Sequence, residues 1–505
     1  MTAARRGLTE QAVAGVLWTS LAMGAQAVLQ IIALLVLARL LSPRDWGVFA
    51  AALVVLGFST IFSQLGVGPA IVQRPTLEGR HIRTGFTLSV LFSLTLLGLI
   101  WAGSAGMARF FAIPESVHVL QAASFVLVFQ GLSAVAENLA LRQLRFRWLA
   151  GVDAIAFATG FIGTAPILAW YGFRVWALVG AYLVQHAVRM VLLVAGQRHE
   201  KRPQLEGRAI SELLYFGGGF TLGRIGNYLA GQGDNFVVGG ALGPQTLGLY
   251  AYAHQLMTAP AVLVGQVLDR VLFPTMAMVQ REPARLARAF RSGTAICALL
   301  TLPASLIVAV VAPELVLVLL GPAWIGVVVP FRILALGMLF RASYKLSDSV
   351  ARATGAVYAR AGRQAVFAVA VIGGAFLGHL WGLGGVAFGV LAAITLNFVL
   401  MTQLSLTLIG ISWREIEAAH RPALALAATL CPATWALVAW LRVQDLSPLT
   451  LLVAVALFAA ALAGALCWSL PRIFLGPDAR SALRTLLTVA SERLRRPVLA
   501  LGRES

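Results

Sequence analysis

Charge is scarce in this sequence. Only 12% of its 505 residues are charged, whereas 59% are hydrophobic and the mean hydropathy is +0.85. A soluble globular domain carries about 25% charged residues, so too little polar surface remains to cover a water-soluble protein of this length. The shortage of charge excludes the soluble enzyme classes and predicts that most of the surface faces lipid.

Residues that enzyme motifs require are also few. The three cysteines form no CxxC pair, which favours neither a zinc site nor a disulfide framework. The two lysines, Lys201 and Lys345, do not follow glycine, so a nucleotide-binding P-loop is excluded. The longest outer loops that we predict, 107–116 and 313–326, are too short for a catalytic surface. We therefore expect no enzyme, no cofactor and no metal.

Long apolar runs are abundant. A membrane-spanning helix needs about 20 apolar residues, and the sequence offers fourteen such windows. The first six predicted spans are 13–39, 46–72, 84–106, 117–140, 149–171 and 175–196. The next six are 209–238, 247–272, 291–312, 327–351, 363–380 and 384–408. The last two are 422–441 and 449–470.

The basic residues predict the orientation of these spans. With the N-terminus in the cytoplasm, 28 of the 39 Lys and Arg residues fall in inner segments and five in outer loops. This asymmetry follows the positive-inside rule. It also accounts for the net charge of +19 through contact with anionic lipid, so we expect no nucleic-acid partner.

A short sequence occurs twice. Residues 41–50 read LSPRDWGVFA and residues 242–251 read LGPQTLGLYA, with four identities at an offset of 201. Each copy falls in the first outer loop of a six-helix set, which predicts a parallel repeat with a substrate path between two bundles. The predicted fold is an all-α polytopic membrane protein. Its regions are two six-helix lobes (1–200 and 201–410), two added helices (411–471) and a basic amphipathic cytoplasmic tail (472–505).

Charged residues lie inside two predicted spans of the second half. The seventh carries Arg224, Asn227 and Asp234 on one helical face, and the tenth carries Arg341, Lys345, Asp348 and Arg352 on another. In one interpretation Arg341 or Lys345 pairs with Asp348, Arg224 pairs with Asp234, and Arg352 reaches to the inner membrane surface. In the other, the cations Arg224, Arg270, Arg332, Arg341 and Lys345 outnumber Asp234, Asp269 and Asp348 and form a wall that binds an anionic diphosphate. The three carboxylates are the candidates for ion coupling.

Uncharged polar residues suggest a second type of contact. Thr19, Gln26 and Gln30 form a stripe on the first helix, and Asn227 lies on the seventh. They are candidates to bind sugar hydroxyls, although such a stripe also fits hydrogen bonding between helices. His186, Arg189 and Glu137 are further polar candidates within the first half.

Several motifs resemble the polysaccharide transporter family, the Wzx-type flippases. The superfamily of these flippases also holds drug extruders and lipid II flippases. The matching stretches are LARLLSPRDWGVFA (37–50), QLGVGPAIVQRP (64–75), LRQLRFRWLA (141–150), DNFVVGGALGPQTLGLYAYA (234–253), VLFPTMAMVQ (271–280) and GPAWIGVVVPFRILAL (321–336). The resemblance covers roughly residues 10–410 and implies export of a polyprenyl-diphosphate-linked oligosaccharide across the bacterial inner membrane by alternating access.

The resemblance also implies partners, and other functions stay open. The expected partners are the lipid-linked oligosaccharide, anionic lipids at the basic tail, and the polysaccharide polymerase and export machinery. The nearest alternative is an ion-coupled small-molecule exporter with the same fold. A membrane glycosyltransferase or polymerase, and a scaffold that acts through residues 472–505, are further alternatives.

Overall fold

The computed structural model is entirely helical over the residues that it describes, which are 26, 29–63, 67–74, 76–278 and 282–481. In this part, nine helices are long and apolar enough to cross a membrane, or ten if the bent pair Pro322–Ala335 and Met338–Ala353 counts as one span. The protein is therefore a multi-pass all-α membrane protein. The predicted total of fourteen spans stays a prediction, because the first span, 13–39, lies largely outside the described residues.

The chain divides into two compact units. The first comprises Met1–Ala251 with Leu319–Trp324, and the second comprises Tyr252–Val318 with Ile325–Ser505. The predicted lobe boundaries were drawn from the sequence repeat, and they remain a proposal. Each unit is described below by itself.

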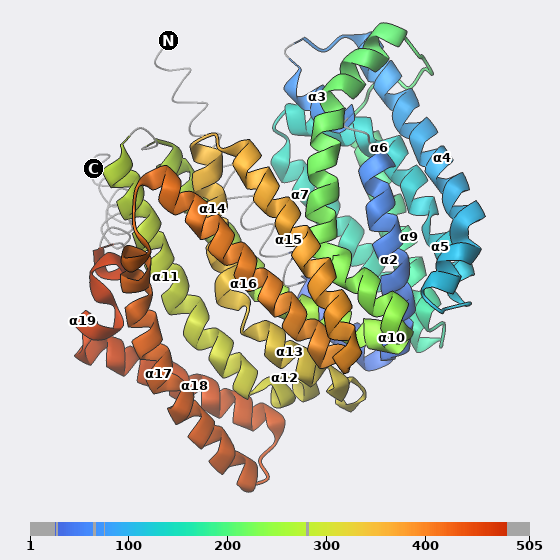
Figure 1. Cartoon of the computed structure of the whole chain (residues 1–505). Helices are drawn as coiled ribbons and strands as arrows, with labels where there is room; N and C mark the ends of the chain where they lie inside the picture. The colour runs from blue at the N-terminus through green and yellow to red at the C-terminus, as the bar shows by residue number, and fades with distance from the viewer. Residues whose placement is uncertain (1–25, 27–28, 64–66, 75, 279–281, 482–505) are drawn as a thin grey trace, which may run out of the picture. The chain divides into compact units, whose positions relative to one another are not determined.

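The helices of the first unit follow the predicted spans (Figure 1). A short apolar helix, Leu29–Leu40, comes first. The others are α2 (Pro43–Ser63), α3 (Val67–Gln73), α4 (Gly79–Phe110), α5 (Ser116–Ala123), α6 (Phe125–Arg142), α7 (Phe146–Phe157), the π-helix η1 (Ala158–Thr164), α8 (Ala165–Trp170) and α9 (Val175–Gly196). Helix α10 (Gly207–Met278) is broken at Gly243, where φ is 82° and ψ is 177°.

Helices of the second unit pack around α11 and α16. They are α11 (Pro283–Val310), α12 (Ala312–Leu319), η2 (Pro322–Val327), α13 (Val328–Ala335), α14 (Met338–Ala353), α15 (Val357–Gly378), η3 (His379–Trp381), α16 (Gly382–Ile409), α17 (Trp413–Val443), α18 (Pro448–Ser469) and α19 (Pro471–Phe474). Figure 1 shows α15 and α16 side by side. A Cβ on Gly374 would lie 2.6 Å from the carbonyl oxygen of Gly389, so glycine permits this close approach.

The first part of α10, up to Ala251, belongs to the first unit and packs against the other helices of that unit. Leu213 is fully buried in an apolar cluster with Val67, Ile71 and Val135. Further along α10, the Tyr228 hydroxyl donates a hydrogen bond to the carbonyl oxygen of Val54 at 2.6 Å. Apolar packing and this hydrogen bond together hold α10 along α2, α3 and α6.

Loops that the sequence predicts on one side of the membrane lie together within the first unit. The two copies of the repeated turn meet at Gly47 and Gly248. Arg44 also pairs with Glu115 of the predicted outer loop 107–116, at 2.8 Å. At the other end, Arg83 pairs with Glu200 at 3.2 Å, which joins two predicted inner segments. The pairing of loops therefore agrees with the predicted alternation of sides.

Candidate functional site

Asp348 lies on the charged face of α14, and its side chain is 10% exposed. Nε of Arg352, one turn later on the same helix, lies 3.1 Å from this carboxylate. Nε of Arg360, on α15, also donates to it. The pairing of Asp348 with Arg341 or Lys345, which one interpretation of the sequence required, is therefore not formed. Asp348 instead forms a local ion-pair cluster with Arg352 and Arg360.

Arg341 and Lys345 are both half-buried on α14, and neither makes an ion pair within the described part of the chain. Nη1 of Arg341 lies 3.2 Å from Nε2 of His254 and donates a hydrogen bond to it, so this ring nitrogen carries no proton. Nζ of Lys345 lies 5.1 Å from the centre of the Tyr344 ring, within range of a cation–π interaction. Two positive charges of α14 are thus stabilised without a carboxylate.

Arg332 has a different environment. It is exposed in the last turn of α13, and its Nε donates to the carbonyl oxygen of Ala309 at 3.0 Å. This carbonyl belongs to the C-terminal turn of α11, which has no helical donor of its own. Arg332 therefore stabilises a helix end, and its Nη atoms carry the remaining donors.

Arg224 and Asp234 of α10 do not pair with each other. Arg224 is half-buried and makes no ion pair among the described residues. Asp234 is buried and accepts a hydrogen bond from the Tyr250 hydroxyl at 2.8 Å and one from the backbone N–H of Asn235 at 2.9 Å. Asn227 is exposed on the same helix.

The structure describes only some of the remaining residues of the predicted site. Gln26 is half-buried and Gln30 is exposed on the first helix, whereas Thr19 lies outside the described residues. The side chains of Asp269 and Arg270 and the tail residues 482–505 also lie outside the described part. Of the charged residues predicted on the two spans, the described part of the structure brings only Asp348 and Arg352 into contact.

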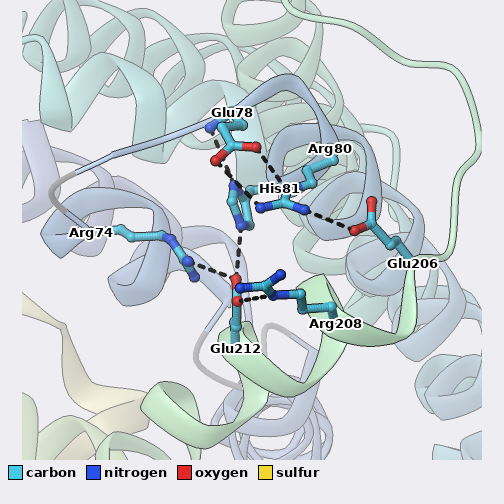
Figure 2. A network of polar contacts seen from close by, with 7 residues as sticks. All are labelled: Arg74, Glu78, Arg80, His81, Glu206, Arg208 and Glu212. Carbon is cyan, nitrogen blue, oxygen red and sulfur yellow. Dashed lines mark hydrogen bonds and ion pairs between the residues drawn. The ribbon is translucent and has the colours of Figure 1, made fainter.

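Sequence reasoning missed a network of seven charged or titratable residues, which we call the Glu212 network (Figure 2). Its members are Arg74, Glu78, Arg80, His81, Glu206, Arg208 and Glu212. The Glu212 carboxylate contacts Arg74 at 2.6 Å, His81 at 3.0 Å and Arg208 at 3.2 Å. These contacts connect the start of α10 to α3 and α4.

His81 is the buried centre of the Glu212 network. Its side chain is fully buried, and Nδ1 accepts a hydrogen bond from the Glu78 backbone N–H at 3.2 Å. Nε2 therefore carries the proton and donates to Glu212. Arg80 pairs with Glu78 at 2.8 Å and with Glu206 at 3.1 Å. The network fixes the first turn of α4 against α10 and its preceding segment.

The segment between α9 and α10 is also anchored to α4. The backbone N–H of Gln204 donates to Oγ1 of Thr87 at 3.0 Å, and the His199 ring packs edge-on against Phe86. Burial lowers the pKa of the His199 imidazole, and the positive charge of Lys201 lowers it further. The segment therefore lies on the bundle as an ordered element.

Arg189 of α9 is fully paired inside the first unit. Its Nη atoms bind both oxygens of Glu137 on α6, at 2.9 and 2.8 Å, and its Nε binds Asp153 on α7 at 2.7 Å. A bidentate guanidinium with a third ligand joins three helices. Arg189 and Glu137, which the sequence offered as polar candidates, thus stabilise the bundle. His186 contacts the Tyr182 ring edge-on.

The fold defines a class of membrane proteins. It is similar to the lipid II flippase MurJ in an inward closed conformation, with a TM-score of 0.73, 12% identity and coverage of 90% of this chain and 99% of that one. It is also similar to an inward-facing multidrug resistance MATE family transporter of the MOP superfamily, with a TM-score of 0.59, 16% identity and coverage of 78% and 95%. The chain has the MOP superfamily fold.

The sequence defines the family within this class. A family model described as polysaccharide biosynthesis protein matches residues 36–329, and the chain belongs to this family. The resemblance seen in the sequence motifs is thereby confirmed.

Two curated relatives match part of this chain, over similar shares of their own lengths. The succinoglycan biosynthesis transport protein ExoT of Rhizobium meliloti (strain 1021) is 26% identical over 61% of this chain, and the alignment spans 62% of ExoT, just under two thirds. The lipopolysaccharide biosynthesis protein WzxC of Escherichia coli (strain K12) is 24% identical, with 66% and 68% covered. The printed names of these two relatives refer to transport in succinoglycan biosynthesis and to lipopolysaccharide biosynthesis.

Proposed function

We propose that the protein translocates a polyprenyl-diphosphate-linked oligosaccharide from the inner to the outer leaflet of the bacterial inner membrane, with both termini in the cytoplasm. ExoT is named a succinoglycan biosynthesis transport protein, and WzxC is named a lipopolysaccharide biosynthesis protein. A diphosphate cannot cross hydrocarbon unaided, whereas a polyprenyl chain can stay in lipid. A flippase for such a molecule needs a polar, cationic passage for the headgroup only.

The observation that carries this proposal is that Arg341 and Lys345 of α14 form no ion pair within the described residues. Asp348 is neutralised by Arg352 and Arg360, so Arg341 and Lys345 keep their charges available. A cation within a membrane span is costly unless it meets water, a partner or an anionic ligand. A diphosphate meets this requirement, and a cationic drug does not. Arg224 and Arg270 are proposed as further diphosphate contacts, and Arg332 through its remaining donors.

Other members of the predicted site keep their proposed roles. Gln26, Gln30 and Asn227, together with Thr19, are proposed to bind sugar hydroxyls. Asp234 and Asp269 remain proposals for ion coupling, whereas the two arginines on Asp348 favour a structural role for that carboxylate. The polymerase and export machinery and anionic lipids are the proposed partners.

The test is a deletion strain complemented with charge-removal variants. We expect the deletion to lose surface polysaccharide and to accumulate the lipid-linked unit on the inner leaflet. Arg341→Gln and Lys345→Gln should each reduce export about tenfold or more, the scale of one charged hydrogen bond. Arg208→Gln is the matched control, because the Arg208 side chain is 75% exposed.

Two results would reject the proposal. Unchanged polysaccharide in the deletion strain would exclude the pathway. Altered drug sensitivity with normal polysaccharide would support the small-molecule exporter, and missing sugars without trapped precursor would support a glycosyltransferase.

A further inference from the structure

A crevice opens between α17 and three neighbouring helices of the second unit. Its volume is about 500 Å³, which is in the range of small-molecule sites. Apolar side chains form three of its walls, with Leu302 from α11, Phe340 from α14 and Phe398 from α16. One face of α17 forms the fourth wall, and we call this space the α17 crevice. All of its lining residues belong to one compact unit.

Polar residues gather at one end of the α17 crevice. The face of α17 that lines it carries Trp413, Glu417, His420, Arg421 and Leu424, which have the spacing of one helical face. The four polar or aromatic members precede residue 422, where the predicted span 422–441 begins. Trp413 is typical of a membrane interface, and its Nε1 donates to Oε1 of Gln403 on α16 at 2.8 Å. The polar end therefore lies at the predicted inner membrane surface, and the apolar walls lie at the depth of the lipid chains.

Two opposite charges at this end do not neutralise each other. Glu417 precedes Arg421 by four residues, which is a spacing at which helical ion pairs form. Both side chains are exposed, and neither forms an ion pair within the part of the chain that the structure describes. The α17 crevice therefore presents a carboxylate and a guanidinium one helical turn apart, each free to bind a ligand group of opposite charge.

The His420 ring supplies an unused hydrogen-bond acceptor. Its Nδ1 lies 2.8 Å from the carbonyl oxygen of Ile416, and because a carbonyl can only accept, Nδ1 carries the proton and Nε2 keeps its lone pair. Nε2 is buried and has no hydrogen-bond partner among the described residues. The ring packs edge-on against Phe398, with the ring centres 6.3 Å apart. A buried acceptor in this position favours a ligand with an N–H or O–H donor.

We propose that the α17 crevice binds an aminophospholipid of the inner leaflet, phosphatidylethanolamine. The guanidinium of Arg421 binds the lipid phosphate. The primary ammonium of the headgroup donates to the carboxylate of Glu417 and to Nε2 of His420, and an acyl chain occupies the apolar walls. This binding site is independent of the molecule that the protein transports.

Other membrane lipids satisfy only part of this site. The headgroup of phosphatidylcholine has no N–H group, so it offers no donor to Nε2 of His420. Phosphatidylglycerol has a phosphate and hydroxyl donors, but it carries no positive charge and its negative charge repels Glu417. The three polar residues together therefore select a headgroup that has both a phosphate and a primary ammonium.

The first experiment measures lipid preference. Phosphatidylethanolamine, phosphatidylcholine and phosphatidylglycerol with identical acyl chains are added to the purified full-length protein in detergent, and bound lipid is measured by native mass spectrometry. We expect the wild type to bind phosphatidylethanolamine about tenfold more tightly than phosphatidylcholine, the scale of one charged hydrogen bond. Equal binding of the three lipids would show nonspecific lipid contact only and would overturn the proposal.

Variants assign the preference to individual residues. Glu417→Gln should weaken binding of phosphatidylethanolamine about tenfold and leave phosphatidylglycerol binding unreduced. Arg421→Gln should weaken both lipids, because both present a phosphate. His420→Phe should lose the preference over phosphatidylcholine, and His420→Gln, which keeps an acceptor, should retain part of it. An equal loss for all lipids in Glu417→Gln would contradict the proposed headgroup contacts.

The matched control is Glu282→Gln. Glu282 also lies at the predicted inner side, its side chain is 52% exposed, and it does not line the α17 crevice. Glu282→Gln removes the same charge as Glu417→Gln, and we expect it to leave the lipid preference unchanged. If both variants change the preference equally, the effect comes from surface charge in general and the proposed site is wrong.

The second experiment uses the wild type, so it does not depend on folding of the variants. A phosphatidylethanolamine with a photoreactive diazirine in one acyl chain is reconstituted with the protein in vesicles. Labelling should fall on the peptides that contain Leu302, Phe340 or Phe398, and unlabelled phosphatidylethanolamine should compete better than phosphatidylcholine. Labelling elsewhere, or equal competition, would overturn the site. Neither experiment involves the transported molecule, so such a result would leave the transport proposal intact.

Discussion

The carboxylate of Asp348 is bound by Arg360, twelve residues later on α15, and not by Lys345, which precedes it by one turn on α14. Helical spacing makes Lys345 and Arg352 equally suitable partners, because residues three and four apart share a helical face. The turn between α14 and α15 instead returns Arg360 to the same carboxylate, and Arg352 supplies the second contact. Among the described residues, Lys345 and Arg341 contact Tyr344 and His254 and form no ion pair.

Asp348→Asn should destabilise the protein. The substitution leaves Arg352 and Arg360 without their carboxylate, and removal of one partner of a largely buried ion pair costs about 3 kcal/mol. Arg360→Gln should cost about 1 kcal/mol, because Asp348 keeps Arg352. Thermal unfolding of the purified protein in detergent measures both. An equal loss in the two variants would contradict the shared cluster.

Glu212→Gln should loosen the contact of α10 with α3 and α4. Arg74 and the buried His81 would lose a charged acceptor, and we expect a loss of about 2 kcal/mol. Arg208→Gln is the control, because the Arg208 side chain is 75% exposed and should contribute less than about 1 kcal/mol. Hydrogen exchange of the first turns of α4 and α10 reports the loosening. Protection unchanged from the wild type would show that the network is dispensable.

Arg442→Gln should detach the end of α17. Arg442 binds Glu314 of α12 through Nε at 2.7 Å, and the Glu314 side chain is only 9% exposed. We expect a loss of about 2 to 3 kcal/mol in thermal unfolding. The Arg44–Glu115 pair is a matched comparison at the same predicted side, since both side chains are 61% exposed and Arg44→Gln should cost less than about 1 kcal/mol. An equal loss of stability in Arg44→Gln and Arg442→Gln would contradict this prediction.

Gly374→Ala and Gly373→Ala should have opposite effects, although the residues are adjacent. A methyl group on Gly374 meets the Gly389 carbonyl and would separate α15 from α16, at a cost of about 1 to 3 kcal/mol. A methyl group on Gly373 has no neighbour within 4 Å, so the better helix propensity of alanine should stabilise the protein by up to about 1 kcal/mol. Thermal unfolding of the two variants distinguishes them.

Local sequence patterns predict the helices of this chain well. The apolar windows correspond to α4, α6, α9 and α11. In lipid, a spanning segment must satisfy its backbone hydrogen bonds internally, so an apolar window of this length forms a helix. The spacing on α14 places Asp348 and Arg352 on one helical face, but the predicted pairing of Asp348 with Arg341 or Lys345 was wrong, because Arg352 and Arg360 bind this carboxylate.

Partners that are distant in the chain could not be predicted from the sequence. Arg74 and Glu212 are 138 residues apart, and their contact depends on how α10 packs along α3 and α4. The same applies to Arg189, whose carboxylates come from α6 and α7. Periodicity describes one helix at a time, so it identifies Arg189 as polar without indicating what neutralises it. The Glu212 network was missed for this reason, since its residues stand at helix ends where charge is ordinary.

The reciprocal contact of the two repeated turns, at Gly47 and Gly248, has a consequence for the origin of the chain. A contact made twice, by equivalent residues in opposite directions, is the kind that two identical half-length polypeptides form across a symmetry axis. In such an ancestral homodimer, one glycine codon would satisfy both sides of the interface. A duplication and fusion of such a gene would place the same requirement on two codons, because a side chain at either glycine would meet the backbone of the opposite turn.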